Sequence, residues 1–135
     1  MFRTLLHTAP INTDAGLLIL RVGAAFFLAT HGYDKLLELI AGNSSGFPDP
    51  FHVSPVVSHA LVVAAEFFSS ILLALGLFTR FALLMLIANM TTIALVIHAG
   101  ESLGDKEHAF LFLIPFVALF LTGPGRYSLD ARLFK

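Results

Sequence analysis

Two charged residues interrupt apolar stretches of this sequence. Arg21 lies in the run over residues 15–30, and Glu66 lies in the run over residues 56–78. Ionisable groups inside a membrane are costly, so they usually face the interior of a helix bundle, pair with one another and mark function. At 1.5 Å per residue, Arg21 lies roughly 9 Å and Glu66 on the order of 16 Å from the same membrane surface. An extended arginine spans much of that difference, so we predict an Arg21–Glu66 ion pair. Its role is either functional or purely structural, fixing helix register.

Further polar residues gather near the opposite ends of the same apolar stretches. His31 and Lys35 are four residues apart and therefore share a helix face. Asn89 lies at middle depth in a third stretch, close to the predicted depth of Glu66. Together these side chains could hold a small polar head group within an apolar bundle. We predict Glu66, His98 and Glu107 as the residues that exchange protons, and Arg21, His31, Lys35, Asn89 and His108 as the residues that bind the ligand.

The same histidines and carboxylates could instead bind a metal ion. Imidazole and carboxylate groups are common metal ligands, and the candidates are His31, His98 and Glu107. Their spacing matches no recognised metal motif, so we favour a quinone or a similar small redox molecule over a metal. Candidates for the lining of such a site are Phe26, Phe27, Phe67 and Phe68.

The composition places the chain among membrane proteins. Of its 135 residues 57% are hydrophobic and only 13% are charged, far outside the usual range for soluble domains. The net charge of −1 and the lack of a basic run argue against nucleic acid as a partner. The chain has no cysteine, which excludes thiolate nucleophiles, disulfides and iron–sulfur clusters held by this chain. The length suits one domain, residues 1–135.

Four segments are apolar enough to form membrane helices, which need about 20 residues each. The loop between the first two is rich in Gly, Pro, Ser and Asn. A tight turn over residues 76–80 makes the second and third helices antiparallel neighbours. We therefore predict an all-α membrane protein, a four-transmembrane-helix antiparallel bundle with an internal polar cavity. The helices are expected at about 15–39, 56–78, 81–98 and 108–122.

The distribution of basic residues predicts how the chain is oriented. Lys and Arg accumulate in the cytoplasmic loops of membrane proteins. Two basic residues, Lys35 and Lys106, fall on one side of the predicted helices, and five fall on the side of the termini. Those five are Arg3, Arg80, Arg126, Arg132 and Lys135. Both termini are therefore expected in the cytoplasm.

Several fragments, in order, resemble the DoxX family of small bacterial four-helix membrane proteins. They are LRVGAAFFLATHGYDKL, AAEFFSSILLALGLFTRFAL, the histidine at position 98, EHAFLFL and GPGRYSLDA, and they extend over about residues 17–133. The resemblance implies a bacterial plasma-membrane protein and an oxidoreductase or a subunit of one. Relatives are associated with terminal quinol oxidase or thiosulfate:quinone oxidoreductase assemblies, or with responses to oxidative stress or quinone-like compounds. The resemblance assigns no catalytic role to any residue here.

Three hypotheses of function follow. The leading one is a membrane subunit of a quinone-linked redox system, in which His98 and Glu107 bind the head group, His31 assists and Glu66 relays a proton. The alternative is a non-catalytic binding or assembly module for partner proteins or a lipid-like ligand. A third, a small transporter or channel, would need a homo-oligomer, because four helices without a visible inverted repeat leave little room for alternating access. The expected partners are membrane lipids and redox partner subunits.

Overall fold

The computed structural model describes residues 6–134, and every regular element in that range is a helix. Apolar residues dominate these segments, and their backbone groups are satisfied within each helix, as a lipid environment requires. Two of the long helices contain a π-helical turn, labelled η. The elements are α2 (Thr13–Ile40), α3 (Pro55–Val63), η1 (Ala64–Phe68), α4 (Ser69–Leu75), α5 (Thr79–Thr92), η2 (Ile93–Ile97), α6 (Leu103–Thr122) and α7 (Leu129–Leu133).

Three helical stretches of the described chain are long and apolar enough to cross a membrane. They are α2, the continuous helix Pro55–Leu75 and the continuous helix Thr79–Ile97. The fourth long helix, α6, has 20 residues, which is also enough to span a bilayer. Its charged residues lie in its first turns and leave the rest apolar. The chain is therefore a membrane protein with three to four helices of spanning length, as the composition indicates.

The fourth helix begins earlier than the sequence predicts. We expected it at residue 108, whereas α6 starts at Leu103. The reason is a capping box, in which the Ser102 hydroxyl and the Asp105 carboxylate each bond the other residue's backbone N–H. The polar segment before His108 is thus the first turn of the helix rather than a loop. The helix continues through Pro115 without a break.

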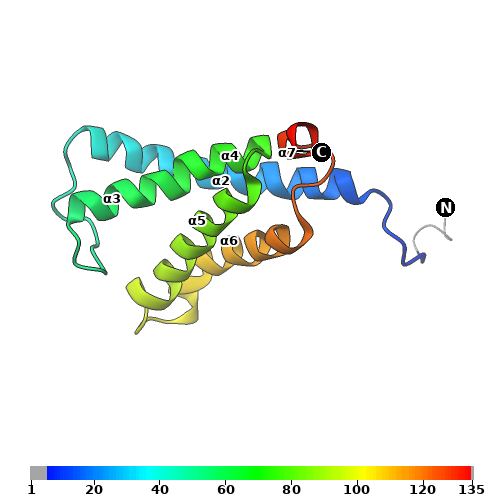
Figure 1. Cartoon of the computed structure of the whole chain (residues 1–135). Coiled ribbons are helices and arrows are strands. Elements are labelled where there is room, and N and C mark those ends of the chain that lie inside the picture. The colour runs from blue at the N-terminus through cyan, green and yellow to red at the C-terminus, as the bar shows by residue number, and fades with distance from the viewer. Residues whose placement is uncertain (1–5, 135) are drawn as a thin grey trace.

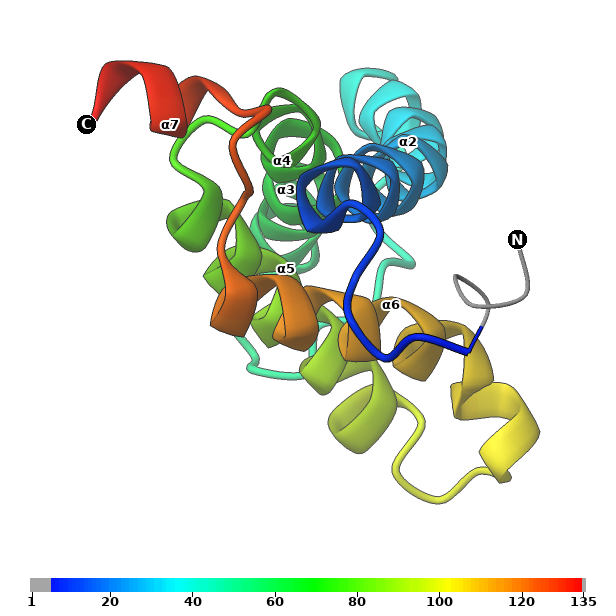
Figure 2. The same ribbon diagram turned by 90° about the vertical axis from the view of Figure 1, so that its right-hand side faces the viewer.

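The long helices form two layers (Figures 1 and 2). One layer holds α2 beside the continuous α3–η1–α4 helix. The other holds α5 beside α6, and it crosses the first layer at an angle (Figure 1). The C-terminal α7 lies near the end of α4 and the start of α5. The four-helix antiparallel bundle and the single domain over residues 1–135 remain predictions.

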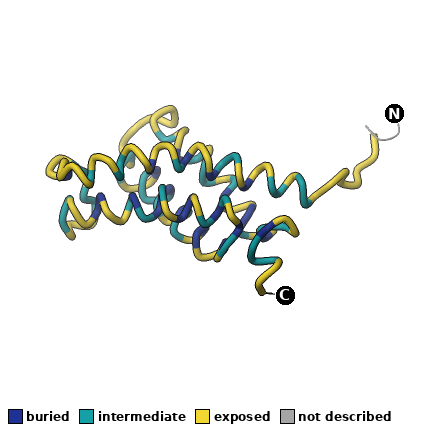
Figure 3. Tube along the Cα trace, turned by 90° about the horizontal axis from the view of Figure 1, so that it is seen from above, coloured by how far each residue is buried: buried dark blue, intermediate teal, exposed yellow. Residues whose placement is uncertain are grey.

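Buried residues lie on the facing sides of the helices, while the outward sides are exposed (Figure 3). Leu28, Leu73, Leu86 and Phe116 are fully buried in one core cluster that joins α2, α4, α5 and α6. Many large apolar side chains face outward, as expected for helices whose outer surface contacts lipid. Two of the predicted orientation residues, Arg3 and Lys135, lie outside the described residues, and the orientation itself remains a prediction.

Candidate functional site

Arg21 does not pair with Glu66, and that prediction is wrong. Its Nη1 donates to the carbonyl of Leu73 at 3.2 Å, and its Nη2 donates to the carbonyl of Tyr127 at 2.6 Å. Arg21 is buried, and it packs against Gly76, whose left-handed φ of 66° ends α4. A Cβ at Gly76 would overlap Arg21 Nη1. The guanidinium therefore ties α2 to the last turn of α4 and to the C-terminal segment.

The direction of the side chains explains this error. Two contacts join α2 to the helix that contains Glu66. Arg21 donates to the Leu73 carbonyl, and His59 Nε2 lies 2.9 Å from the Lys35 carbonyl. Glu66 lies midway between residues 59 and 73, so position along the helix does not decide whether Arg21 or Lys35 reaches it. Helical side chains tilt towards the N-terminus of their own helix. That tilt carries the arginine away from Glu66 and the lysine towards it.

Glu66 is instead held by a lysine and an amide. Its Oε2 accepts from Lys35 Nζ at 2.5 Å, and its Oε1 accepts from Asn89 Nδ2 at 3.0 Å. The Glu66 side chain is 2% exposed, whereas that of Lys35 is 31% exposed. Three separate helices thus supply a group in which the carboxylate is buried and the ammonium is not. Lys35 and Asn89, predicted to bind a ligand, do lie together with Glu66.

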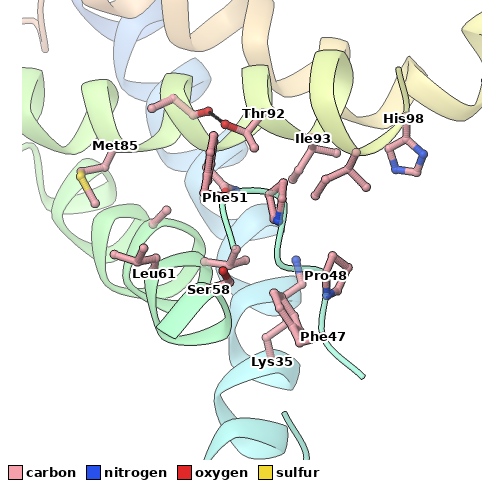
Figure 4. A pocket seen from close by; sticks show the side chains of 16 residues that line it. Lys35, Phe47, Pro48, Phe51, Ser58, Leu61, Met85, Thr92, Ile93 and His98 are labelled. Carbon is pink, nitrogen blue, oxygen red and sulfur yellow. Dashed lines mark hydrogen bonds between the residues drawn. The ribbon is translucent and has the colours of Figure 1, made fainter. Parts of the chain in front are cut away.

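A cavity of about 480 Å³ opens beside this group. Both Lys35 and Asn89 lie in its wall, and most of the remaining lining is apolar. Figure 4 shows side chains from the loop after α2, from α3 and from α5–η2 directed into it. The volume falls within the range of about 300–1,000 Å³ that is usual for small-molecule sites. Besides Lys35 and Asn89, its polar lining residues are Ser58, Thr92 and His98.

The two π-helical turns both border the cavity. Residue Ala65 of η1 and residues Ile93 and Ile97 of η2 lie in the wall. A π-helical turn contains one residue more than the α-helical pattern, and such turns occur frequently at functional sites. In η1 this turn includes Glu66, and η2 ends immediately before His98. The irregular turns therefore coincide with the predicted polar residues.

The loop between α2 and α3 covers one side of the cavity with aromatic and proline side chains. Phe47 lines the cavity and stacks on His59 with a ring-centroid distance of 4.1 Å. His59 is fully buried, and its Nδ1 lies 2.9 Å from Ser44 Oγ. Since His59 Nε2 faces the carbonyl of Lys35, the neutral ring donates from Nε2 and accepts from Ser44 at Nδ1. These contacts fix the first half of the loop.

Asp49 fixes the second half of the loop. Its Oδ1 accepts from Ser58 Oγ at 2.7 Å and from the backbone N–H of Val53 at 3.1 Å. The hydrogen bond from Ser58 is the main reason that the pKa of Asp49 lies below its usual value. The carboxylate therefore stays ionised and holds the loop against the start of α3.

His98 pairs with a residue that the sequence did not single out. Its Nδ1 lies 2.5 Å from Glu101 Oε2, so the ring donates from Nδ1 and presents Nε2 as an acceptor when it is neutral. His98 lines the cavity. Glu107, the predicted partner in proton exchange, lies in the wall of a different hollow of about 440 Å³ on α6. The structure therefore does not bring His98 and Glu107 together.

The remaining predicted residues form a separate pair. His31 of α2 and His108 of α6 meet edge to face with ring centroids 5.0 Å apart. Neither ring lines the cavity that contains His98. Within the described residues, no group of three or more His, Asp or Glu side chains is placed to hold a metal ion. The three metal candidates are thus distributed over three different places.

The aromatic lining also differs from the prediction. Phe26 and Phe27 are 62% and 63% exposed on the outer face of α2. Phe67 and Phe68 of η1 do not line the cavity either. The cavity is instead lined by Phe47 and Phe51 of the loop. A signal for the loop was present in the sequence, because the segment FPDPF places two phenylalanines and two prolines in an otherwise polar connection. Glu101 carried no such signal beyond its spacing of three residues from His98.

A second polar cluster surrounds Arg21, whose side chain does not line the cavity beside Glu66. Asp130 of α7 accepts from the backbone N–H groups of Phe78 and Thr79, each at 2.8 Å, and so caps the start of α5. Burial alone would raise the pKa of Asp130, but hydrogen bonds from Thr79 and Phe78 and the charge of Arg21 lower it below its usual value. With Gly76, these residues form the Arg21 cluster, which joins α2, α4, α5 and α7.

Comparison with known proteins agrees with this membrane fold. The DoxX family model matches residues 16–99, which include Arg21, Lys35, Glu66, Asn89 and His98. An uncharacterised protein of Haemophilus influenzae is 32% identical over 131 residues, covering 88% of this chain and 91% of that protein. No solved structure matches the chain. The matched length, well over half of the sequence, establishes that this chain belongs to the DoxX family.

Proposed function

We propose that the chain is a membrane subunit of a quinone-linked redox system and holds the quinone head group in the cavity beside Glu66. The observation that carries the proposal is a buried carboxylate whose two partners, Lys35 and Asn89, also face an apolar cavity. Perturbed or buried charges next to a cavity are characteristic of functional sites. The Arg21 cluster, by contrast, supports the fold.

The cavity fits a head group of this kind. Aromatic and aliphatic side chains cover most of its wall, and the polar groups are those of Lys35, Ser58, Asn89, Thr92 and His98. A quinone would supply two-electron, two-proton redox chemistry. In this proposal Lys35 donates a hydrogen bond to a ring oxygen, while the His98–Glu101 pair exchanges a proton near the end of η2.

Glu66 has a positioning role in this proposal. Both of its oxygens are occupied by Lys35 and Asn89, so it holds those side chains in place and balances the lysine charge. Since the chain has no cysteine, no iron–sulfur cluster held by thiolates of this chain can pass electrons to the ring, and the proposal assigns that step to a partner subunit. Glu107 and the His31–His108 pair lie outside the cavity and have no part in this step.

The alternative is a non-catalytic module that holds a lipid-like ligand or partner proteins. The charge balance of Lys35 and Glu66 favours it, because a neutralised pair can serve structure alone. Such a module would bind a ligand in the same cavity or a partner on the helix faces, but it would not undergo redox turnover.

Native mass spectrometry of the chain, purified gently from its own membrane, tests the proposal. We expect a stoichiometric quinone that is lost in His98→Ala and in Glu66→Gln but retained in the control His7→Ala, whose histidine lies outside the cavity. Intact quinone binding and redox activity in both cavity variants would overturn the assignment. A reproducible partner protein with no small ligand would favour the assembly module.

The proposal includes a location in the bacterial plasma membrane with both termini in the cytoplasm, within a four-helix antiparallel bundle. Because the chain lacks cysteine, single substitutions can be labelled selectively. In intact cells, a membrane-impermeant maleimide should label Ala99→Cys and not Arg126→Cys, both of which are at exposed positions. The reverse pattern would invert the proposed orientation.

A further inference from the structure

The polar groups around the cavity offer a ligand mainly hydrogen-bond acceptors. Ser58 Oγ donates its proton to Asp49 at 2.7 Å, and Thr92 Oγ1 donates its proton to the carbonyl of Ala88 at 2.9 Å. Each hydroxyl has thereby used its only proton inside the protein, and each retains lone pairs that can accept a hydrogen bond. Figure 4 shows both residues in the cavity wall.

Of the other polar groups, His98 and Asn89 also present acceptors, whereas Lys35 presents donors only. His98 directs its Nδ1 to Glu101, so Nε2 of the neutral ring is an acceptor. Asn89 donates one N–H to Glu66, which fixes the orientation of its amide because an ionised carboxylate can only accept. The Oδ1 of Asn89 is left as an acceptor beside one remaining N–H. Lys35 keeps two N–H donors after its bond to Glu66.

The cavity wall beside Glu66 therefore offers both donors and acceptors. Lys35 Nζ and Asn89 Nδ2 bind the two oxygens of the Glu66 carboxylate, and both residues line the cavity. A hydroxyl group can accept from a donor of this wall and donate to one of its acceptors at the same time. A carbonyl or ether oxygen can only accept, and it leaves the acceptors of the wall without a partner. An unpaired buried polar group costs about 1–3 kcal/mol.

We infer that the cavity selects an aromatic ring bearing a free hydroxyl, that is, a phenol or the hydroquinone form, over the corresponding ether or oxidised quinone. This inference rests on the proposed function, since it names the chemical form that the same cavity prefers. The apolar wall, with Phe47 and Phe51 in the loop, accommodates the ring and its hydrocarbon substituent.

Binding to the purified chain in detergent tests this preference with three probes of equal chain length. They are a para-alkylphenol, its methyl ether, and a redox-stable alkylated benzoquinone. We expect the phenol to bind at least about ten-fold more tightly than the ether, as one additional hydrogen bond to a charged or buried partner would provide. The quinone should bind more weakly than the phenol.

Two variants locate the preference on the cavity wall. Asn89→Leu should remove most of the difference between phenol and ether, and Thr92→Val should reduce it without changing the shape of the side chain. Thr30→Val is the matched control, because the Thr30 hydroxyl also donates to a main-chain carbonyl, at 2.7 Å, but lies outside the cavity. Thermal unfolding of each variant confirms that it is folded, and Thr92→Val keeps the test intact if Asn89→Leu does not fold.

The possible outcomes separate the two proposals. Equal affinity for phenol and ether, or tighter binding of the quinone, would overturn the hydroxyl preference and leave the quinone-linked function standing. A preference unchanged in both Asn89→Leu and Thr92→Val would also overturn it, because the wall groups would not be its cause. Failure of all three probes to bind would overturn the proposed function and the preference together.

Discussion

The Arg21 cluster and the Glu66 group are alike in composition and different in surroundings. Both contain a buried charge that belongs to an apolar helix. The Arg21 guanidinium donates to the carbonyls of Leu73 and Tyr127, and Arg21 does not line the cavity. The Glu66 carboxylate accepts from two side chains, Lys35 and Asn89, which do line it. This difference is the reason that we propose a ligand site beside Glu66 and a structural role for Arg21.

The first test of this comparison is Gly32→Ala, for which we expect the largest effect. Gly32 is buried where α2 meets η1, and a Cβ there would lie 2.5 Å from Phe67 N and 2.6 Å from the Glu66 carbonyl carbon. Because backbone must move, the free energy of unfolding should fall by about 3 kcal/mol. Displacement of Glu66 should also weaken ligand binding.

Thermal unfolding in detergent and ligand affinity measure both effects. The control is Gly23→Ala on the same helix, where an added Cβ meets nothing within 4 Å. It should leave both quantities nearly unchanged, or raise stability slightly because Ala favours the helix. A Gly32→Ala protein with normal stability and affinity would contradict the close packing of α2 on η1.

Gly76→Ala separates the two regions. The variant forces alanine into a left-handed conformation and against Arg21, so we expect the free energy of unfolding to fall by about 2 kcal/mol. Ligand affinity of the folded protein should not change, because the Arg21 cluster does not line the cavity. Denaturant unfolding and a binding isotherm measured on the same sample check the two expectations. A parallel loss of affinity would show that the regions are coupled.

Glu66→Gln should have the opposite profile. The amide still accepts from one neighbour but no longer balances Lys35, so ligand affinity should fall about ten-fold. Stability should fall by only about 1 kcal/mol, because Lys35 is 31% exposed and its ammonium can be hydrated. Glu38→Gln, at an exposed position of α2, is the matched control. Unchanged affinity in Glu66→Gln would remove Glu66 from the site.

Asp130→Asn tests the structural role of the Arg21 cluster, and we expect it to have the smallest effect on stability. Loss of the charged cap on α5 should cost about 1 kcal/mol at pH 7. The pKa of Asp130 is lower in the folded chain than its ordinary value near 3.8. The stabilisation by the ionised carboxylate is therefore complete at pH values above 3.8 and is lost as the pH falls through the pKa of the folded chain. The difference in unfolding temperature between wild type and variant should therefore shrink on acidification from pH 7 to pH 3. A constant difference would mean that the carboxylate charge does not stabilise the cap.

The amino-acid sequence by itself determined the membrane class, the helical segments and the family. Apolar runs about 20 residues long leave few alternatives to helices in lipid, and turn residues such as Gly76 and the proline-rich loop set their ends. The positions of polar residues in these runs pointed to Glu66, Lys35, Asn89 and His98. They pointed equally to four residues that do not line the cavity, namely Arg21, His31, Glu107 and His108. These properties depend on local composition, which a single sequence records.

Only the tertiary structure decided which of these residues meet. Arg21 and Lys35 lie at similar distances from Glu66 along the helices. Because helical side chains tilt towards the N-terminus of their own helix, Lys35 forms the ion pair with Glu66. The path of the α2–α3 loop places Phe47 in the cavity wall. The turn after η2 lets His98 hydrogen-bond Glu101 and not Glu107. Pairing depends on rotation, tilt and loop path in three dimensions, and residue spacing along one chain does not contain that information.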